Sequence, residues 1–152
     1  YKMKLAIVGT SKVGYGDQTD RFIYEIRKII MQYYEEYGSN LTIVSGHSPK
    51  GGVDIFAESI AQSFKIKTDI YPAEVNQWGG KNVNHKRLKG YKARNVQIAK
   101  GCNVLYCFTR FNSDKRKGCY HCQNYKHLRT GGCWTMKAAK KLGKEVHLII
   151  VD

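Results

Sequence analysis

Residues 41–64 read LTIVSGHSPKGGVDIFAESIAQSF. The run from Leu41 to Ser45 is almost entirely apolar and stops at Gly46, which is typical of a strand that is covered on both faces. After two more glycines, apolar side chains recur at spacings of mostly three and four residues, at Val53, Phe56, Ala57, Ile60 and Phe64. This spacing predicts one face of a helix. The stretch therefore predicts one strand, loop and helix unit of an α/β fold.

Similar units lie on both sides of this stretch. We expect further strands at residues 3–8, 66–71, 104–108 and 146–151, further helices at 22–37, 86–99 and 135–142, and a polar loop at 76–84. Helices that alternate with apolar strands imply parallel pairing. The sequence thus predicts an α/β fold: a three-layer, Rossmann-like, doubly wound parallel sheet of about five strands. We expect a single domain over residues 1–152, with residues 110–133 as an insertion, because they are too long for an ordinary connection.

The chain is strongly basic. It has 26 Lys and Arg against 12 Asp and Glu, a formal net charge of +14, and its cations are spread along the sequence. Such an excess attracts polyanions, so nucleotides, nucleic acid and anionic membranes are the candidates, and a lysine-rich surface kept for solubility is the alternative. An apolar content of 42% excludes a disordered chain. No apolar run reaches the roughly 18 residues of a membrane span, which excludes an integral membrane protein. Of the polyanions, we expect nucleotides or nucleic acid and no membrane as the partner.

The five cysteines are unevenly placed. The spacing Cys119-x2-Cys122-x4-His127-x5-Cys133 supplies three thiolates and one imidazole, which is the ligand set of a closed, structural zinc site. His121 is a competing ligand, but because it lies between Cys119 and Cys122, its side chain should point away from the metal. Thiols that bind nothing are the alternative. The odd count and the lack of a signal-peptide pattern indicate a reducing cytoplasm rather than a disulfide framework.

Four polar, mostly glycine-bearing segments follow predicted strands or precede a predicted helix. They are Gly9-Thr10-Ser11-Lys12, residues 45–52, Thr109-Arg110 and residues 130–135. In a doubly wound sheet these positions meet at the edge where ligands bind. Glycines let the backbone approach a phosphate, and a helix N-terminus offers free N–H groups. Each segment alone is an ordinary turn, but together they predict an anion site.

Several of these segments resemble the SLOG superfamily, which contains the lonely-guy cytokinin-activating enzymes, the DNA-processing protein A family and the YspA-like proteins. Ser45-Gly46, Gly51-Gly52-Val53-Asp54 and Ala57-Glu58 resemble its "SGGARGVDxxAE" element. The YspA-like branch is similar at Gly9-Thr10-Ser11-Lys12 ("GSR"), Tyr71-Pro72-Ala73 ("FPAD"), Arg94-Asn95 ("RNxxMA") and Gly131-Gly132 with Thr135 ("GGT"). The loop between Gly46 and Gly51 departs from the "SGGARGVDxxAE" pattern, because it has two extra residues within 47–50.

The resemblance implies that the chain binds a nucleotide or a nucleotide-derived ligand in phosphate-binding loops, and family members often form homodimers. The expected ligand-binding residues are Gly9, Thr10, Ser11, Lys12, Ser45, Gly46, Gly51, Gly52, Asp54, Arg94, Asn95, Arg110, Gly131, Gly132 and Thr135. The lonely-guy phosphoribohydrolases use a "PGGxGTxxE" motif with a catalytic Glu. Met136 and Lys137 stand where that acid would be needed, which argues against nucleotide hydrolysis and leaves open whether the protein is an enzyme.

Two features keep alternatives open. Asp54 and Glu58 contact a ribose or move protons in one interpretation, and complement the dipole of their helix in the other. The second feature is a mixture of aromatic and basic residues in and beside the insertion: Phe111, Lys115, Arg116, Lys117, Tyr120, Tyr125, Lys126, Arg129 and Trp134. This composition is typical of proteins that bind single-stranded nucleic acid. In the alternative interpretation, the aromatic side chains form a small core of the insertion. The second hypothesis is therefore a single-stranded nucleic-acid-binding protein, and the least favoured is a phosphoribohydrolase.

Overall fold

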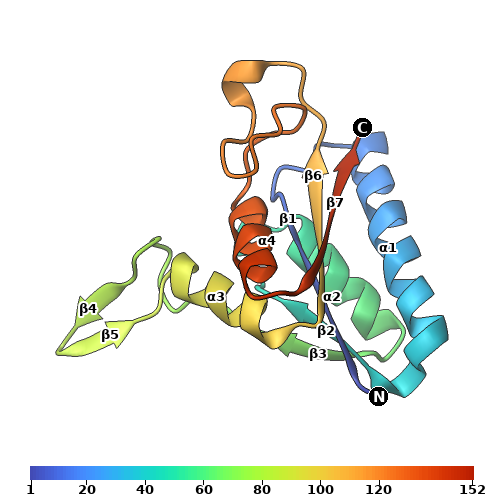
Figure 1. Ribbon diagram of the computed structural model, residues 1–152, viewed down its shortest axis with the longest axis horizontal. Coiled ribbons are helices and arrows are strands. Elements are labelled where there is room, and N and C mark those ends of the chain that lie inside the picture. The colour runs from blue at the N-terminus through green and yellow to red at the C-terminus, as the bar shows by residue number, and fades with distance from the viewer.

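The computed structural model of the protein describes all 152 residues. Its main sheet is parallel throughout, with the strand order β3-β2-β1-β6-β7 (Figure 1). The strands are β1 (Met3–Gly9), β2 (Leu41–Ser45), β3 (Lys67–Ile70), β6 (Val104–Arg110) and β7 (Glu145–Val151). The helices are α1 (Asp17–Tyr37), α2 (Val53–Ser63), α3 (Tyr91–Gly101) and α4 (Gly131–Lys141). The predicted five-stranded, doubly wound α/β fold is confirmed.

Side-chain alternation along the strands produces the three layers. Leu5 and Ile7 of β1 pack into the apolar core shared with α1 and α2, whereas Ala6 and Val8 pack into a second core shared with α3 and α4. Both faces of the strand are therefore buried, which explains its continuous apolar sequence. Fully burying one large aliphatic side chain contributes about 1.5–3 kcal/mol. Because each core buries apolar side chains of its two helices, the burial energy holds α1 and α2 on one face and α3 and α4 on the other.

The order of the strands creates a switch point beside β1. The chain first builds β2 and β3 outward from β1, and then crosses to place β6 on the other side of β1. The loops that follow β1 and β6 therefore lead to helices on opposite faces of the sheet, which leaves a crevice between these loops at the carboxyl ends of the two strands. At this edge Gly9 lies opposite Phe108, and the backbone N–H of Thr10 donates to the Phe108 carbonyl at 3.1 Å.

The helix expected at residues 86–99 begins later. Residues 81–88 form an antiparallel hairpin, β4 (Lys81–Val83) and β5 (Lys86–Leu88), and α3 starts at Tyr91. Asn84 and His85 both have positive φ, 49° and 64°, as a tight two-residue hairpin turn requires. Gly90 precedes the helix because a Cβ there would lie 2.0 Å from the Gln77 carbonyl oxygen. The expected loop at 76–84 is therefore only partly a loop.

The last helix begins earlier than expected, at Gly131 rather than near Thr135. Thr130 caps it, because its side-chain oxygen accepts a hydrogen bond from the Gly132 N–H at 3.2 Å. Residues 111–130, here called the lobe, connect β6 to α4 and contain a short 3-10 turn, Lys115–Lys117. Two isolated bridges, Phe111 with His127 and Gly118 with Leu128, hold the lobe together. The helices lack an apolar stretch of the length and hydropathy that crossing a bilayer requires.

Candidate functional site

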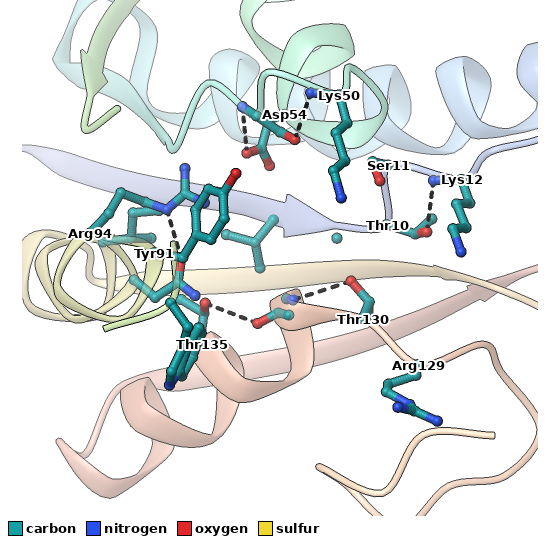
Figure 2. A pocket seen from close by; sticks show the side chains of 18 residues that line it. Thr10, Ser11, Lys12, Lys50, Asp54, Tyr91, Arg94, Arg129, Thr130 and Thr135 are labelled. Carbon is teal, nitrogen blue, oxygen red and sulfur yellow. Dashed lines mark hydrogen bonds between the residues drawn. The ribbon is translucent and has the colours of Figure 1, made fainter. Parts of the chain in front are cut away.

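A cleft of about 270 Å³ opens at the carboxyl end of β1, at the switch point (Figure 2). This volume is close to the lower end of small-molecule sites, about 300 Å³. The cleft is lined by Val8, Gly9, Thr10, Ser11, Lys12, Ser48, Lys50, Asp54, Trp78, Tyr91, Arg94, Asn95, Ile98, Arg129, Thr130, Gly131, Gly132 and Thr135. Four of these side chains are cationic and one is acidic, so the cleft favours an anionic ligand.

Two glycines bring the end of β1 against the start of α4. A Cβ on Gly132 would lie 2.8 Å from the Gly9 Cα, and a Cβ on Gly9 would lie 2.0 Å from the Phe108 carbonyl oxygen. No other residue allows the two backbones this close. Gly9 and Gly132 are therefore required for packing, and their approach places the first loop beside the helix N-terminus.

The first turn of α4 and the loop after β1 supply the polar surface of the cleft. Thr130, Gly131 and Gly132 line it, so the positive end of the α4 dipole faces the cleft. Across from them the side-chain oxygen of Thr10 accepts a hydrogen bond from the Lys12 N–H at 2.9 Å, which shapes the loop (Figure 2). This arrangement of helix N-terminus and polar loop can bind a phosphate.

Asp54 is the only carboxylate among the cleft residues. It lies in the first turn of α2, and its Oδ2 accepts a hydrogen bond from the Ser48 N–H at 3.2 Å. Burial raises the pKa of Asp54 to about 6, and the nearby Glu58 charge adds to the rise while Arg94 opposes it. A carboxyl group with this pKa can accept a hydrogen bond from a ligand hydroxyl near neutral pH.

Glu58, one turn further along α2, has both oxygens engaged inside the protein. Ser45 Oγ donates to its Oε2 at 2.7 Å, and His47 Nδ1 lies 2.6 Å from its Oε1. The side chain of Ser45 is therefore committed to Glu58 and does not line the cleft. Of the two acids on α2, only Asp54 is placed to meet a ligand.

Arg94 and Asn95 are buried polar residues near the start of α3. The Arg94 guanidinium donates to the Gly46 carbonyl at 2.5 Å and to the Asn95 side-chain oxygen at 2.8 Å. Burial lowers the pKa of Arg94, and the Asp54 charge opposes that shift. The Arg94 side chain also accounts for Gly46, because a Cβ there would lie 2.6 Å from a guanidinium nitrogen.

The structure brings ten of the fifteen predicted ligand residues to the cleft: Gly9, Thr10, Ser11, Lys12, Asp54, Arg94, Asn95, Gly131, Gly132 and Thr135. Ser45 and Gly46 lie behind the cleft, where they contact Glu58 and Arg94. Gly52 packs on the first loop, with the Val53 N–H donating to the Thr10 carbonyl at 3.1 Å, and Gly51 does not line the cleft. Arg110 lies outside the cleft, beside Gln18 and Phe22 of α1.

The expected ligand list omitted six polar or aromatic residues of the cleft: Ser48, Lys50, Trp78, Tyr91, Arg129 and Thr130. Thr130 carried a readable signal, because threonine is a preferred helix cap and Thr130 lies shortly before a predicted helix start. Trp78 carried a weak signal, because an aromatic side chain beside Gly79 and Gly80 can stack on a base at the rim of a cleft. Tyr91 carried none, since only the hairpin that separates it from Trp78 brings it to the cleft. Arg129 reaches it from the end of the lobe.

The four predicted metal ligands lie together in the lobe and the first turn of α4. The ligand atoms of Cys119, Cys122, His127 and Cys133 all lie within 4.8 Å of one another. His127 Nε2 is 3.1 Å from Cys122 Sγ and 3.6 Å from Cys133 Sγ, and ligands of a tetrahedral zinc lie about 3.6–3.8 Å apart. The donor set and its spacing therefore fit a metal ion.

The surroundings of His127 prepare it as a ligand. Its Nδ1 lies 2.7 Å from the Leu128 carbonyl oxygen, which leaves Nε2 free to face the cysteines. Burial lowers the pKa of His127 and favours the neutral imidazole, the form that binds metal. His121 does not join the cluster, as expected, and its ring packs on Tyr120 with centroids 4.3 Å apart.

Comparison with known proteins adds one clear likeness. No protein-family model and no curated protein sequence matches the chain. DNA processing protein A from Streptococcus pneumoniae superposes with a TM-score of 0.57 at 17% identity, over 97% of this chain and 50% of that one. The chain thus spans about half the length of that protein, and the two share a fold. A weaker likeness joins it to a 2-desoxiribosyltransferase from Leishmania mexicana, with a TM-score of 0.43 at 11% identity, over 99% of this chain and 65% of that one.

Proposed function

We propose that the protein binds a nucleotide or a nucleotide-derived ligand in the cleft. The observation that carries this proposal is the convergence of the loop Thr10–Lys12 with the capped N-terminus of α4. This pair of elements offers a phosphate the helix dipole and the backbone N–H groups of Ser11 and Gly131. The neighbouring N–H groups of Lys12 and Gly132 already donate to side-chain oxygens of the protein and shape the two segments. The charges of Lys12 and Lys50, which both line the cleft, add to that attraction.

The remaining cleft residues suit the other parts of a nucleotide. Asp54 is placed to accept a hydrogen bond from a ribose hydroxyl. Trp78 and Tyr91 supply aromatic faces on the side of the cleft formed by α3, where a base can stack. Phosphate, sugar and base would thus run from α4 towards α3.

The fold shared with DNA processing protein A supports the resemblance to the SLOG superfamily, and the YspA-like branch remains our assignment within it. That neighbour is a DNA-processing protein by name, which together with the net charge of +14 favours single-stranded nucleic acid as the second candidate ligand. Hydrolysis of a nucleotide is the least favoured function, because Met136 and Lys137 of α4 replace the acid of the lonely-guy motif.

We assign a structural Zn²⁺ to Cys119, Cys122, His127 and Cys133. Three thiolates and one imidazole fill a tetrahedron and leave no open position for catalysis. The metal would supply cross-links that order the lobe, whose regular structure is limited to one short turn and two isolated bridges. The lobe is in this view an insertion within a single domain.

Calorimetric titration with nucleoside mono- and diphosphates tests the binding proposal. The wild type should bind at least one of them. Lys12→Gln should weaken that binding roughly 5–30-fold, as expected for a lost charged hydrogen bond. Lys4→Gln is the matched control, because Lys4 carries the same charge on the same strand unit but pairs with Asp69 outside the cleft. Failure of every nucleotide to bind, or equal weakening by both variants, would contradict the proposal.

A further inference from the structure

The net charge of the protein comes from one continuous part of the chain. Residues 75–144 contain 17 of the 26 Lys and Arg but only one of the 12 acids, Asp114. That acid is itself paired with Arg116, with Nε and Oδ1 3.2 Å apart. Residues 1–74 contain nine cations and nine acids and are neutral. The cations are spread along the sequence, but the acids are not, so the two parts of the chain differ sharply in charge.

The fold turns this difference in sequence into a difference between faces. Residues 75–144 build the hairpin, α3, β6, the lobe and α4, whereas α1 and α2 belong to the neutral part. Helices α3 and α4 share one apolar core, and α1 and α2 share the other. In Figure 1 the hairpin projects beyond the body of the domain, away from α1 and α2, and the lobe projects beyond the carboxyl end of β6. One side of the molecule is therefore strongly basic.

The β4–β5 hairpin is the most one-sided element of this basic side. Lys81, Lys86, Arg87 and Lys89 are all exposed, and the hairpin has no acid. Charged side chains on exposed strands also discourage pairing with other strands, but that purpose does not require one sign of charge. None of the three lysine side chains makes a hydrogen bond or salt bridge within the protein, so they are free to meet a partner.

The base of the hairpin is fixed to the rim of the cleft. The N–H groups of Tyr91 and Lys92 donate to the carbonyls of Gln77 and Trp78 at 2.9 and 3.0 Å. Trp78 and Tyr91 both line the cleft, and Trp78 packs edge-on against Trp134 of α4 with ring centroids 5.0 Å apart. A two-stranded hairpin is only marginally stable alone, and these contacts hold it at a defined place.

The cleft lies between the bases of the two basic projections. Trp78 and Tyr91 flank it where the hairpin begins and ends, and Arg129 flanks it where the lobe ends. The Arg129 guanidinium lies over the Tyr120 ring, 4.9 Å from its centroid, which orients it from within the lobe. An anionic chain that leaves the cleft would meet positive charge on both sides.

We propose that the hairpin is a binding surface for the phosphate backbone of a single-stranded nucleic acid, one nucleotide of which occupies the cleft. The inference rests on the proposed nucleotide site and extends it from one nucleotide to a strand. A single strand is indicated because a base can enter the cleft and stack on an aromatic side chain only when it is unpaired. The hairpin and Arg129 would then hold phosphates on the two sides of that nucleotide.

The test compares two triple variants with equal loss of charge. Lys81→Gln, Lys86→Gln and Lys89→Gln remove charge from the hairpin, and Lys2→Gln, Lys28→Gln and Lys65→Gln remove it from exposed positions of the neutral part. Fluorescence anisotropy measures the binding of a labelled oligothymidylate of about 12 nucleotides, a length within the usual range of single-strand sites. Calorimetry with a mononucleotide runs in parallel.

The hairpin variant should lose about 10–100-fold in oligonucleotide affinity, and its dependence on log salt should flatten by about 2, which is about 0.7 for each of three lost phosphate contacts. The control variant should change both quantities much less, and mononucleotide binding should be the same in all three proteins. An equal loss in both variants, or no loss in the hairpin variant, would overturn the proposal. A preference for duplex over single strand would overturn it as well. Hairpin-dependent oligonucleotide binding without any mononucleotide binding would support the hairpin surface and refute the nucleotide site.

Discussion

Asp54 combines burial with a position in the cleft, and its ionisation therefore opposes folding. Burial raises the pKa of Asp54 from its ordinary value to about 6, so the folded protein binds this proton more tightly than the unfolded chain does. Stability from this group is complete below about pH 4 and is lost as the pH rises to about 6, at about 1.4 kcal/mol for each unit of pKa difference.

The substitution Asp54→Asn removes this titration. We expect it to stabilise the protein relative to the wild type by about 2 kcal/mol more at about pH 7.5 than at about pH 4.5. An amide oxygen can still accept the hydrogen bond from the Ser48 N–H, so the local structure should survive. Urea unfolding at the two pH values measures the difference. A stability difference that does not change with pH would show that Asp54 is solvated or paired more closely with Arg94 than the structure indicates.

Two neighbouring glycines at the start of α4 should respond in opposite ways to the same added methyl group. In Gly132→Ala the Cβ would lie 2.8 Å from the Gly9 Cα and 2.9 Å from the Gly9 nitrogen, and a backbone cannot move aside as a side chain does. We expect a loss of about 1–3 kcal/mol in stability, as for other overpacked sites.

Gly131→Ala is the matched control, because a Cβ there meets nothing within 4 Å. Alanine favours helices over glycine by up to about 1 kcal/mol, so this variant should be neutral or more stable. Thermal unfolding of both variants checks the pair. Equal stability of the two would mean that β1 and α4 approach each other less closely than described.

At the scale of elements, Cys133 connects the metal cluster to the cleft. It is the third residue of α4, directly after Gly131 and Gly132, so a metal bound to Cys133 would fix the helix start that faces the cleft. A preorganised loop spares a ligand the cost of ordering it. We therefore expect Cys133→Ser to lower the zinc content and to weaken nucleotide binding together.

Cys102→Ser provides the comparison for that variant, because Cys102 is also buried in the core shared by α3 and α4 but lies outside the metal cluster. It should leave zinc content and nucleotide affinity nearly unchanged. Elemental analysis and calorimetry on the same preparations measure both. Loss of zinc from Cys133→Ser with unchanged nucleotide affinity would show that the lobe and the cleft work independently.

The elements also show what the sequence could and could not predict. The strands were predictable from their short apolar runs and α1 from the helical spacing of its apolar side chains, and the Cys and His spacing placed the four ligand candidates in one cluster. The hairpin was not, because Asn84 and His85 form its turn through positive φ angles without the glycine that usually marks such turns. Tyr91 reaches the cleft only because this hairpin brings it back to Trp78, so no local pattern could assign it.

At the scale of the whole molecule, one edge of the sheet gathers the polar features that the chain carries in separate segments. The loop after β1, the start of α2, the start of α3 and the start of α4 meet at the cleft, and the two basic projections rise beside it. Helices α1 and α2, which carry more acids than cations, cover the opposite face. The proposed ligand surface thus lies beside α3, α4 and the two projections, away from the face that α1 covers.

The most direct test is an amide chemical-shift titration of the labelled protein with a nucleoside monophosphate. A phosphate at the start of α4 should produce its largest shifts at the backbone amides of Ser11, Lys12, Gly131 and Gly132, with smaller ones near Trp78 and Tyr91. Amides of α1 and the region around Arg110 should stay unchanged. Shifts confined to α1 or to the far face, or no shifts at all under saturating nucleotide, would contradict the assignment of the cleft as a nucleotide site.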